Sequence, residues 1–166
     1  MNLILWRHAE AEENLRETYA SDLRRQLTER GHKQAQQMAQ WLREHLPKQY
    51  VVIASPALRT QQTAKALSDD FLTEESIAPN ADVSAVLAAI DWPSGLGVGN
   101  LVAGKKADTV VVVGHQPTLG RVASLLLSGN EQHWSVKKGA IWWLAARQRE
   151  AESQVVLRTV IAPDLL

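Results

Sequence analysis

Three short apolar segments constrain the fold of this chain more than any other feature. They are residues 3–6 (LILW), 50–54 (YVVIA) and 109–113 (TVVVV). Each is rich in β-branched or bulky residues and is short enough for a strand, and the third, β-branched throughout, is typical of a strand buried on both faces. Because stretches with helical periodicity separate the three segments, the sequence predicts an α/β fold built around a central sheet.

Amphipathic helices are expected between these strands. Thr28 is suited to cap a helix that runs to about Leu46, and Ser55, followed by Pro56, is the expected cap of the next helix. Two more helices are expected, around residues 83–90 and after residue 117. Residues 9–26 lack a clean period and are expected to form mainly a loop.

The C-terminal part of the chain has the pattern of a β-hairpin. Residues 140–146 and 154–161 read as two strands around a polar turn at 147–153. A chain of 166 residues is long enough for one domain. The expected architecture is a three-layer α/β/α sandwich with a mostly parallel sheet and a C-terminal antiparallel hairpin, in a single domain spanning residues 1–166.

Composition excludes several classes of function. Lys and Arg total 18, as do Asp and Glu, so the formal net charge is zero and no nucleic-acid partner is expected. The chain has no cysteine, which excludes disulfides, thiolate catalysis and Cys-ligated zinc. No stretch approaches the roughly 20 apolar residues of a membrane span, so a cytoplasmic protein without a membrane partner is expected.

The ends of the three strands carry the residues with the most chemical promise. The first strand leads into Arg7 and His8, the second leads to Arg59 one turn into the next helix, and the third leads into His115. If the strands are parallel, these side chains meet at one edge of the sheet, where ligands of open α/β sheets bind. Arginines, histidines and helix N-termini favour anions, so a phosphate-like dianion is the expected ligand.

A metal site is the competing interpretation of these residues. His8 and His115 could ligate a metal together with Glu10. Two neighbouring arginines would repel a divalent cation, however, and therefore favour an anion. No metal and no organic cofactor is expected.

Four motifs resemble those of the histidine phosphatase superfamily, which has the phosphoglycerate mutase-like fold. Residues 7–10 (RHAE) resemble its Arg-His-Gly motif, and residues 27–35 (LTERGHKQA) resemble a Leu-Thr-x-x-Gly-x-x-Gln-Ala stretch. The other two matches are residues 55–64 (SPALRTQQTA), similar to Ser-x-x-x-Arg-x-x-x-Thr-Ala, and residues 113–117 (VGHQP), similar to a late Gly-His segment. All four occur in family order.

The short chain and the Gly-His-Gln-Pro segment are most similar to the SixA branch, whose members are protein phosphohistidine phosphatases. This resemblance implies removal of phosphate from histidine on a signalling phosphotransfer protein. It implies catalytic roles for His8, Arg7, Arg59 and His115, of which the last three would also hold the phosphate with help from Asn14. The motif departs from the family at Ala9, where glycine is usual.

The resemblance also raises the question of a proton donor. Many members carry an acid in the middle of the chain, and Asp82 is the only acid in the matching region, where it is better suited to cap the following helix than to donate a proton. A phosphohistidine substrate needs less protonation than an ester because its leaving group is a ring nitrogen. We therefore expect His8 to attack phosphorus and form a phosphohistidine intermediate. The alternatives are a hydrolase of small phosphate esters and a phosphate-recognition module without turnover; the oligomeric state stays open.

Overall fold

A computed structural model describes residues 1–95, 108–149 and 152–166 of the chain. Its centre is a mixed sheet of six strands in the order β3-β2-β4-β1-β5-β6. Strands β1 to β4 run parallel to one another, and β5 and β6 are antiparallel additions at one side. The strand bounds are β1 (Asn2–Arg7), β2 (Val51–Ala54), β3 (Leu72–Thr73), β4 (Thr109–Gly114), β5 (Ile141–Arg149) and β6 (Glu152–Ile161).

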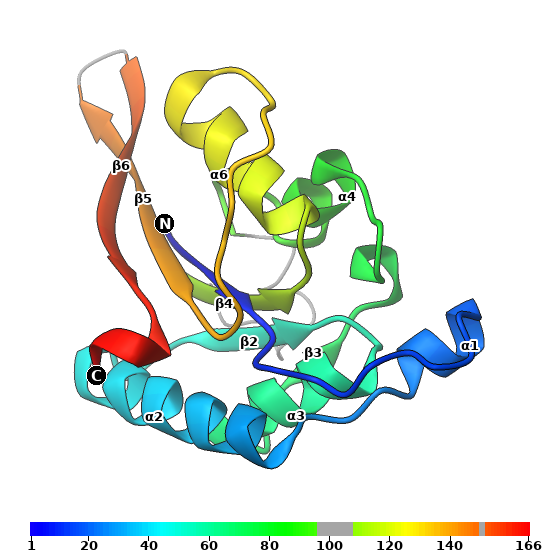
Figure 1. The fold of residues 1–166 in the computed structure, drawn as a ribbon. Helices are drawn as coiled ribbons and strands as arrows, with labels where there is room; N and C mark the ends of the chain where they lie inside the picture. The colour runs from blue at the N-terminus through cyan, green and yellow to red at the C-terminus, as the bar shows by residue number, and fades with distance from the viewer. Residues whose placement is uncertain (96–107, 150–151) are drawn as a thin grey trace.

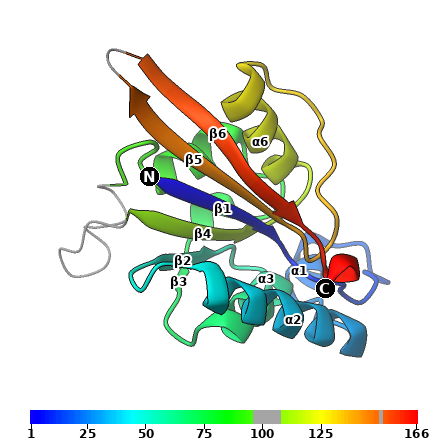
Figure 2. The ribbon, with the colours of Figure 1, turned by 90° about the vertical axis from the view of Figure 1, so that its left-hand side faces the viewer.

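Helices cover both faces of this sheet (Figures 1 and 2), which confirms the predicted three-layer architecture. Alternate residues of β1 point to opposite faces, as strand geometry requires. Ile4 and Trp6 pack with α2 and α3, whereas Leu3 and Leu5 pack with α4 and α6. The helix bounds are α1 (Tyr19–Leu23), α2 (Glu29–His45), α3 (Leu58–Leu67), α4 (Val83–Ala89) and α6 (Thr118–Ser128), with 3₁₀ turns at Glu75–Ile77 and Pro163–Leu165.

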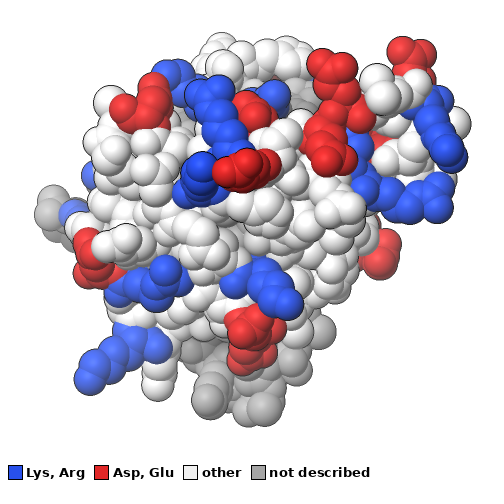
Figure 3. Space-filling model, turned by 60° about the horizontal axis from the view of Figure 1, so that its bottom comes forward, with Lys and Arg blue, Asp and Glu red and all other residues white. Residues whose placement is uncertain are grey.

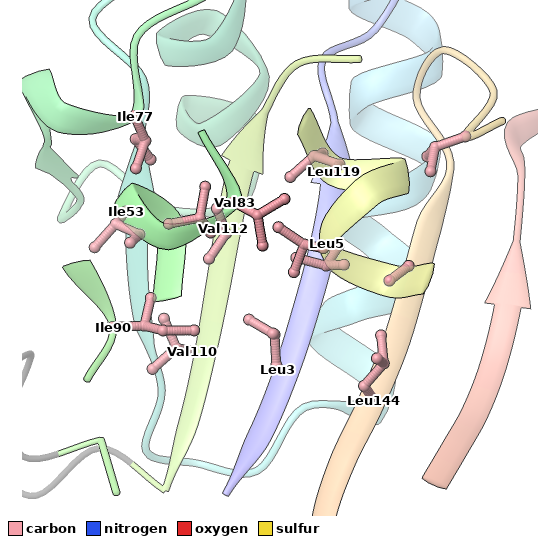
Figure 4. Close-up of a cluster of buried hydrophobic side chains, with 14 of the residues drawn as sticks. Leu3, Leu5, Ile53, Ile77, Val83, Ile90, Val110, Val112, Leu119 and Leu144 are labelled. Atoms are coloured by element: carbon pink, nitrogen blue, oxygen red, sulfur yellow. The ribbon is translucent and has the colours of Figure 1, made fainter. Parts of the chain in front are cut away.

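The cluster on the α4 and α6 side shows how the apolar strands hold the sheet in place. Figure 4 shows Leu3 and Leu5 of β1 beside Val112 of β4, facing Val83 of α4 and Leu119 of α6. Each of these five side chains is no more than 5% exposed. Full burial of such a side chain stabilises the fold by about 1.5–3 kcal/mol, so the central strands form a rigid support for the residues at their ends.

Helix α2 begins as the sequence predicts. Thr28 is its N-cap and accepts a hydrogen bond from the backbone N–H of Gly31 at 3.0 Å, and the helix ends at His45, just before the predicted boundary. Its buried stripe contains Ala35, Met38 and Leu42, spaced as one helical face requires.

Two predicted boundaries differ from those of the structure, and two other segments contain elements that the sequence analysis did not place. Helix α3 begins at Leu58 with Ala57 as its N-cap, because the Ser55 hydroxyl is engaged elsewhere. Residues 71–81 contain the two-residue strand β3, which pairs with β2. The loop at residues 9–26 contains α1 and an antiparallel bridge between Ala11 and Leu27. Strands β5 and β6 extend further than predicted, and the middle of the turn between them lies outside the described residues.

Charged side chains are interspersed on the face that carries α2 and α3. Figure 3 shows Lys and Arg close to Asp and Glu on that face, without a large patch of one sign among the described residues. Exposed pairs such as Lys33–Glu29 at 2.9 Å contribute to this pattern. No helix in the described ranges has both the length and the apolar character needed to cross a bilayer.

Candidate active site

The carboxyl ends of β1, β2 and β4 meet at one edge of the sheet, as predicted. Arg7, the last residue of β1, pairs with Gly114 of β4, and the backbone N–H of His8 donates to the Gly114 carbonyl at 3.1 Å. On the other side of β4, the N–H of Ser55 donates to the Val113 carbonyl at 3.1 Å. The strand pairing therefore brings together residues that are more than a hundred positions apart in the chain.

His8 is held by its own loop. Its Nδ1 lies 2.7 Å from the carbonyl oxygen of Ala9, so we assign the proton to Nδ1 and leave a lone pair on Nε2. Ala9 is itself fixed, because its N–H donates to Oγ1 of Thr63 in α3 at 3.1 Å. The φ angle of Ala9 is not among the positive ones, so alanine replaces the glycine of the family motif without backbone strain.

Arg59 lies at the centre of the site and is 3% exposed. Its Nε donates to Nε2 of His8 at 3.3 Å, and its Nη2 lies 3.2 Å from Nδ1 of His115. The same guanidinium donates from Nη1 to the backbone oxygen of Asp22 at 2.7 Å and from Nη2 to its Oδ2 at 3.1 Å. A planar guanidinium with several N–H groups in fixed directions thus links both histidines to α1.

His115 is oriented by a buried hydroxyl. Its Nε2 lies 2.7 Å from Oγ of Ser55, which is fully buried. Because Nδ1 accepts from Arg59, Nε2 carries the proton and donates to Ser55. The rings of His8 and His115 lie 5.3 Å apart between centroids, tilted by 56°.

Arg7 approaches the site from the end of β1. Its Nη1 donates to the backbone oxygen of Val136 at 2.7 Å, which anchors the side chain. Its Nε is buried and has no hydrogen-bond partner within the described part of the chain. Buried guanidinium N–H groups normally have hydrogen-bond partners, so a bound anion nearby would explain this unpaired donor.

These residues surround a pocket of about 350 Å³. Four cationic residues line it, and Asp22 is its only acid among the described residues; the full lining is Arg7, His8, Asp22, Arg25, Arg59, Pro79, Asn80, His115, Gln116 and Lys138. The cations come from β1, the loop after α1, α3 and the segment before β5. A positively charged lining in a concave site favours an anionic ligand.

Burial keeps both histidines neutral. Burial lowers the pKa of His8 to about 3, an effect that the nearby arginines increase and the hydrogen bond to Ala9 partly opposes. Burial and then the charge of Arg59 lower the pKa of His115 to about 2. Burial also lowers the pKa of Arg7 and that of Arg59, but arginine stays charged in proteins. The site therefore combines neutral imidazoles with permanent positive charges near pH 7.

Two predicted site residues do not line this pocket. Asn14 is engaged with α1: its Nδ2 donates to the Thr18 carbonyl at 3.1 Å, and its Oδ1 accepts from the Ser21 hydroxyl at 2.5 Å. Asp82 is the N-cap residue of α4 and borders a separate pocket with Glu131. Neither residue is therefore part of the lining of the pocket that contains His8.

Several other residues that line the pocket were not identified from the sequence. Asp22 and Arg25 lie in a stretch expected to be a loop, and their ion pair (2.9 Å) follows i,i+3 spacing. Asn80, whose φ of 68° lies in the left-handed region, reaches the pocket from the connector before α4. Asn and Asp tolerate this conformation better than most residues, and such backbone outliers concentrate at functional sites, which is a signal a sequence does not display.

The comparison with known proteins agrees with this geometry. A family model of the histidine phosphatase superfamily (branch 1) matches residues 3–80. An uncharacterized protein of Picosynechococcus sp. is 31% identical over 170 residues, covering 96% of each chain. A phosphohistidine phosphatase SixA homolog of Haemophilus influenzae is 29% identical over 139 residues, covering 76% of this chain and 77% of that protein.

Solved structures share the fold over almost the whole length of the chain. The protein histidine phosphatase SixA complexed with tungstate has a TM-score of 0.76 at 23% identity, covering 99% of both chains. The alpha-ribazole phosphatase of Shigella flexneri has a TM-score of 0.66 at 19% identity, covering 98% of this chain and 97% of the other. Taken with the motifs and the arginine–histidine cluster, the family model and these relatives show that the chain belongs to the histidine phosphatase superfamily, within which it is similar to SixA.

Proposed function

We propose that this chain removes phosphate from phosphohistidine through a covalent intermediate on Nε2 of His8. The geometry supports His8 as the nucleophile because Nδ1 is tied to the Ala9 carbonyl and His8 lines the pocket. The lone pair of Nε2 accepts from Nε of Arg59 at 3.3 Å, and attack on phosphorus replaces this hydrogen bond. The low pKa of His8 keeps that lone pair free of a proton at neutral pH. A nucleophile that is already deprotonated needs no separate base.

The proposed reaction has two steps. A bond forms between Nε2 of His8 and phosphorus while the phosphorus–nitrogen bond of the substrate breaks, and the substrate histidine leaves as a neutral imidazole that carries a proton on its other ring nitrogen. Water then attacks phosphorus, the bond to Nε2 breaks, and inorganic phosphate forms. Arg7, Arg59 and His115 hold the phosphoryl oxygens, since charge stabilisation is the main requirement of phosphoryl transfer.

The mid-chain residues that line the pocket are the observation that favours phosphohistidine over a phosphate ester as the substrate. Pro79 and Asn80 line it, whereas Asp82, the candidate proton donor, borders another pocket. The one described acid of the lining, Asp22, is paired with Arg59 and Arg25. A site without an available carboxylic acid suits a leaving group that needs little protonation, as a histidine ring nitrogen does.

We propose a protein that carries phosphohistidine, of the histidine phosphotransfer kind, as the partner. A small phosphate ester is the second candidate substrate. The pocket volume of about 350 Å³ is large enough for a small molecule, and the alpha-ribazole phosphatase has the same fold. A recognition module without turnover is less well supported, because His8 lines the pocket and burial keeps it uncharged.

The test compares rates on one phosphohistidine protein and a panel of small esters, with His8→Ala as the inactive control. We expect kcat/KM for phosphohistidine to exceed that for every ester by at least tenfold. Radioactive phosphate trapped on the wild-type protein should be lost in acid, as phosphohistidine is, and should be absent from His8→Ala. An acid-stable label, or normal turnover by His8→Ala, would contradict the nucleophile assignment, and faster ester hydrolysis would favour the second substrate.

A further inference from the structure

The carboxylate of Asp22 lies between two arginines of the pocket. Its Oδ2 accepts from Nη2 of Arg59 at 3.1 Å and its Oδ1 accepts from Nε of Arg25 at 2.9 Å. An acid that lines a site for an anion is unexpected, because it repels the ligand. We propose that Asp22 is a positioning residue that competes with phosphate for the N–H groups of Arg59 and thereby limits how tightly the site holds phosphate.

Arg59 has few N–H groups to spare for a ligand. Of the five that a guanidinium carries, Nε donates to His8, one on Nη1 donates to the Asp22 backbone oxygen, and Nη2 contacts both the Asp22 carboxylate and His115. A phosphate oxygen that binds Nη2 must therefore replace either the Asp22 carboxylate or the ring of His115.

Of these two partners, Asp22 is the one that can yield. His115 is 5% exposed, and the Ser55 hydroxyl holds its other ring nitrogen. Asp22, by contrast, belongs to α1, a helix of five residues of which none is buried, and its side chain is 22% exposed. Figure 1 shows α1 projecting from the body of the protein. Movement of a partly exposed carboxylate disturbs less packing than movement of a buried ring.

This competition gives Asp22 two opposite effects. Its negative charge neutralises part of the positive charge on Arg59 and Arg25 and so stabilises the protein without phosphate. The same charge repels a phosphate dianion and occupies its donors, so it weakens phosphate binding. A residue with a merely structural role has no reason to weaken binding, and its removal would lower stability and phosphate affinity together.

The inference rests on the proposed function only in requiring that this site binds phosphate. The test distinguishes a failure of the inference from a failure of the proposed function. Inorganic phosphate is titrated calorimetrically into the wild type and Asp22→Asn, and the unfolding temperature of each is measured without phosphate. Asp22→Asn should unfold at a lower temperature yet bind phosphate about fivefold more tightly, which corresponds to about 1 kcal/mol, the size of a partly exposed ion pair. It should also be inhibited by product phosphate at correspondingly lower concentrations.

Three further variants make the outcome specific. Asp22→Glu keeps the charge and should bind phosphate within about twofold of the wild type, since a twofold change is only about 0.4 kcal/mol. Glu13→Gln removes a charge from an exposed residue of the same segment outside the pocket lining and should change neither quantity. Asp22→Ser repeats the main test with a smaller neutral side chain. If the wild type binds phosphate and the neutral variants bind it equally or more weakly, the inference is overturned; if the wild type does not bind phosphate, the proposed function fails as well.

Discussion

Gly31 of α2 lies directly against the backbone carbonyl of Glu10, so a Cβ atom at residue 31 would lie 1.9 Å from that oxygen. The same carbonyl accepts from the N–H of Thr28 at 3.0 Å, and the Glu10 carboxylate accepts from the Thr28 hydroxyl at 2.8 Å. The N-terminus of α2 is therefore fastened to the loop that begins with His8. The absence of a side chain at residue 31 allows this close approach of the helix to the loop.

We predict that Gly31→Ala destabilises the protein by about 1–3 kcal/mol, as overpacking of a tight contact does, in spite of the better helix propensity of alanine. The added methyl group must push the Glu10 backbone away and with it Ala9, whose carbonyl orients His8. Urea unfolding measures the loss of stability, and kcat/KM should fall at the same time. Gln37→Ala, on the exposed side of α2, is the matched control and should change the unfolding free energy by less than about 0.5 kcal/mol. A Gly31→Ala protein as stable and as active as the wild type would show that the loop accommodates the methyl group.

A second prediction concerns the contact between Ser55 and His115. Ser55→Ala removes the acceptor that holds the Nε2 proton of His115 and leaves a buried N–H unsatisfied. We expect kcat to fall about tenfold, since loss of a buried partner costs about 1–3 kcal/mol, with a smaller change in KM. Steady-state kinetics at constant pH provide the measurement.

The control for this variant is Ser84→Ala, an exposed serine of α4 outside the pocket, which should leave both kinetic constants unchanged. Ser55→Thr retains a hydroxyl and should recover part of the activity. Equal kcat values for Ser55→Ala and the wild type would mean that the hydroxyl does not orient His115 during the reaction.

The sequence predicts the centre of this site because strand topology brings it together. Arg7, His8 and His115 follow directly from strands β1 and β4, and Arg59 lies one turn beyond β2, so a parallel sheet is enough to make them neighbours. Asp22 and Arg25 could not be placed in the same way. They belong to a segment without apolar periodicity. Its position depends on individual hydrogen bonds, from Arg25 to the Glu12 backbone oxygen and from Arg59 to the Asp22 backbone oxygen, which no sequence pattern predicts.

The fold is predictable to the same degree and for the same reason. Buried strands and amphipathic helices are determined by the positions of apolar residues, and their order in the chain gives the layers. The start of α3 differs from the one that the sequence predicts, because a serine before a proline usually caps a helix. Here the Ser55 hydroxyl contacts His115, a residue 60 positions away, and the helix begins without a side-chain cap. Similarly, the N-cap position of Asp82 is predictable from the sequence, but its place in a pocket other than that of His8 is not.

The low pKa values of His8 and His115 predict how stability depends on pH. Both are neutral in the folded protein down to about pH 3, whereas in the unfolded chain they bind protons below about pH 6.5. The unfolded state therefore binds more protons between these limits, and stability falls as the pH is lowered from about 6.5. Each histidine contributes up to about 1.4 kcal/mol per pH unit to this slope and nothing above that range.

Urea unfolding of the wild type between pH 4.5 and pH 8 measures this dependence. Carboxylates also contribute to the slope, so the comparison is with His8→Asn and His115→Asn, each of which should show a smaller slope below pH 6.5. Saturating phosphate should reduce the wild-type slope as well, because a nearby anion raises the pKa of both histidines. Identical slopes in the wild type and both variants would mean that these histidines are protonated in the folded protein.

The last prediction concerns Asn80, the mid-chain residue that lines the pocket in place of an acid. Asn80→Asp introduces a carboxyl group there, and aspartate tolerates the left-handed φ of 68° about as well as asparagine does. General acids contribute about 10²–10⁴-fold when ideally placed, so we expect at least a tenfold rise in kcat/KM for alkyl phosphate esters. Hydrolysis of phosphohistidine should stay constant or decline, because its leaving nitrogen gains little from the acid and the new charge repels phosphate.

Rates measured in parallel on both substrates from pH 5 to pH 8 test this prediction, with the remote, exposed Asn130→Asp as the matched control. If kcat/KM changes by the same factor for both substrates, the identity of residue 80 does not select the leaving group. If kcat/KM rises for esters alone, the lack of an acid at residue 80 is connected to the choice of a phosphohistidine substrate.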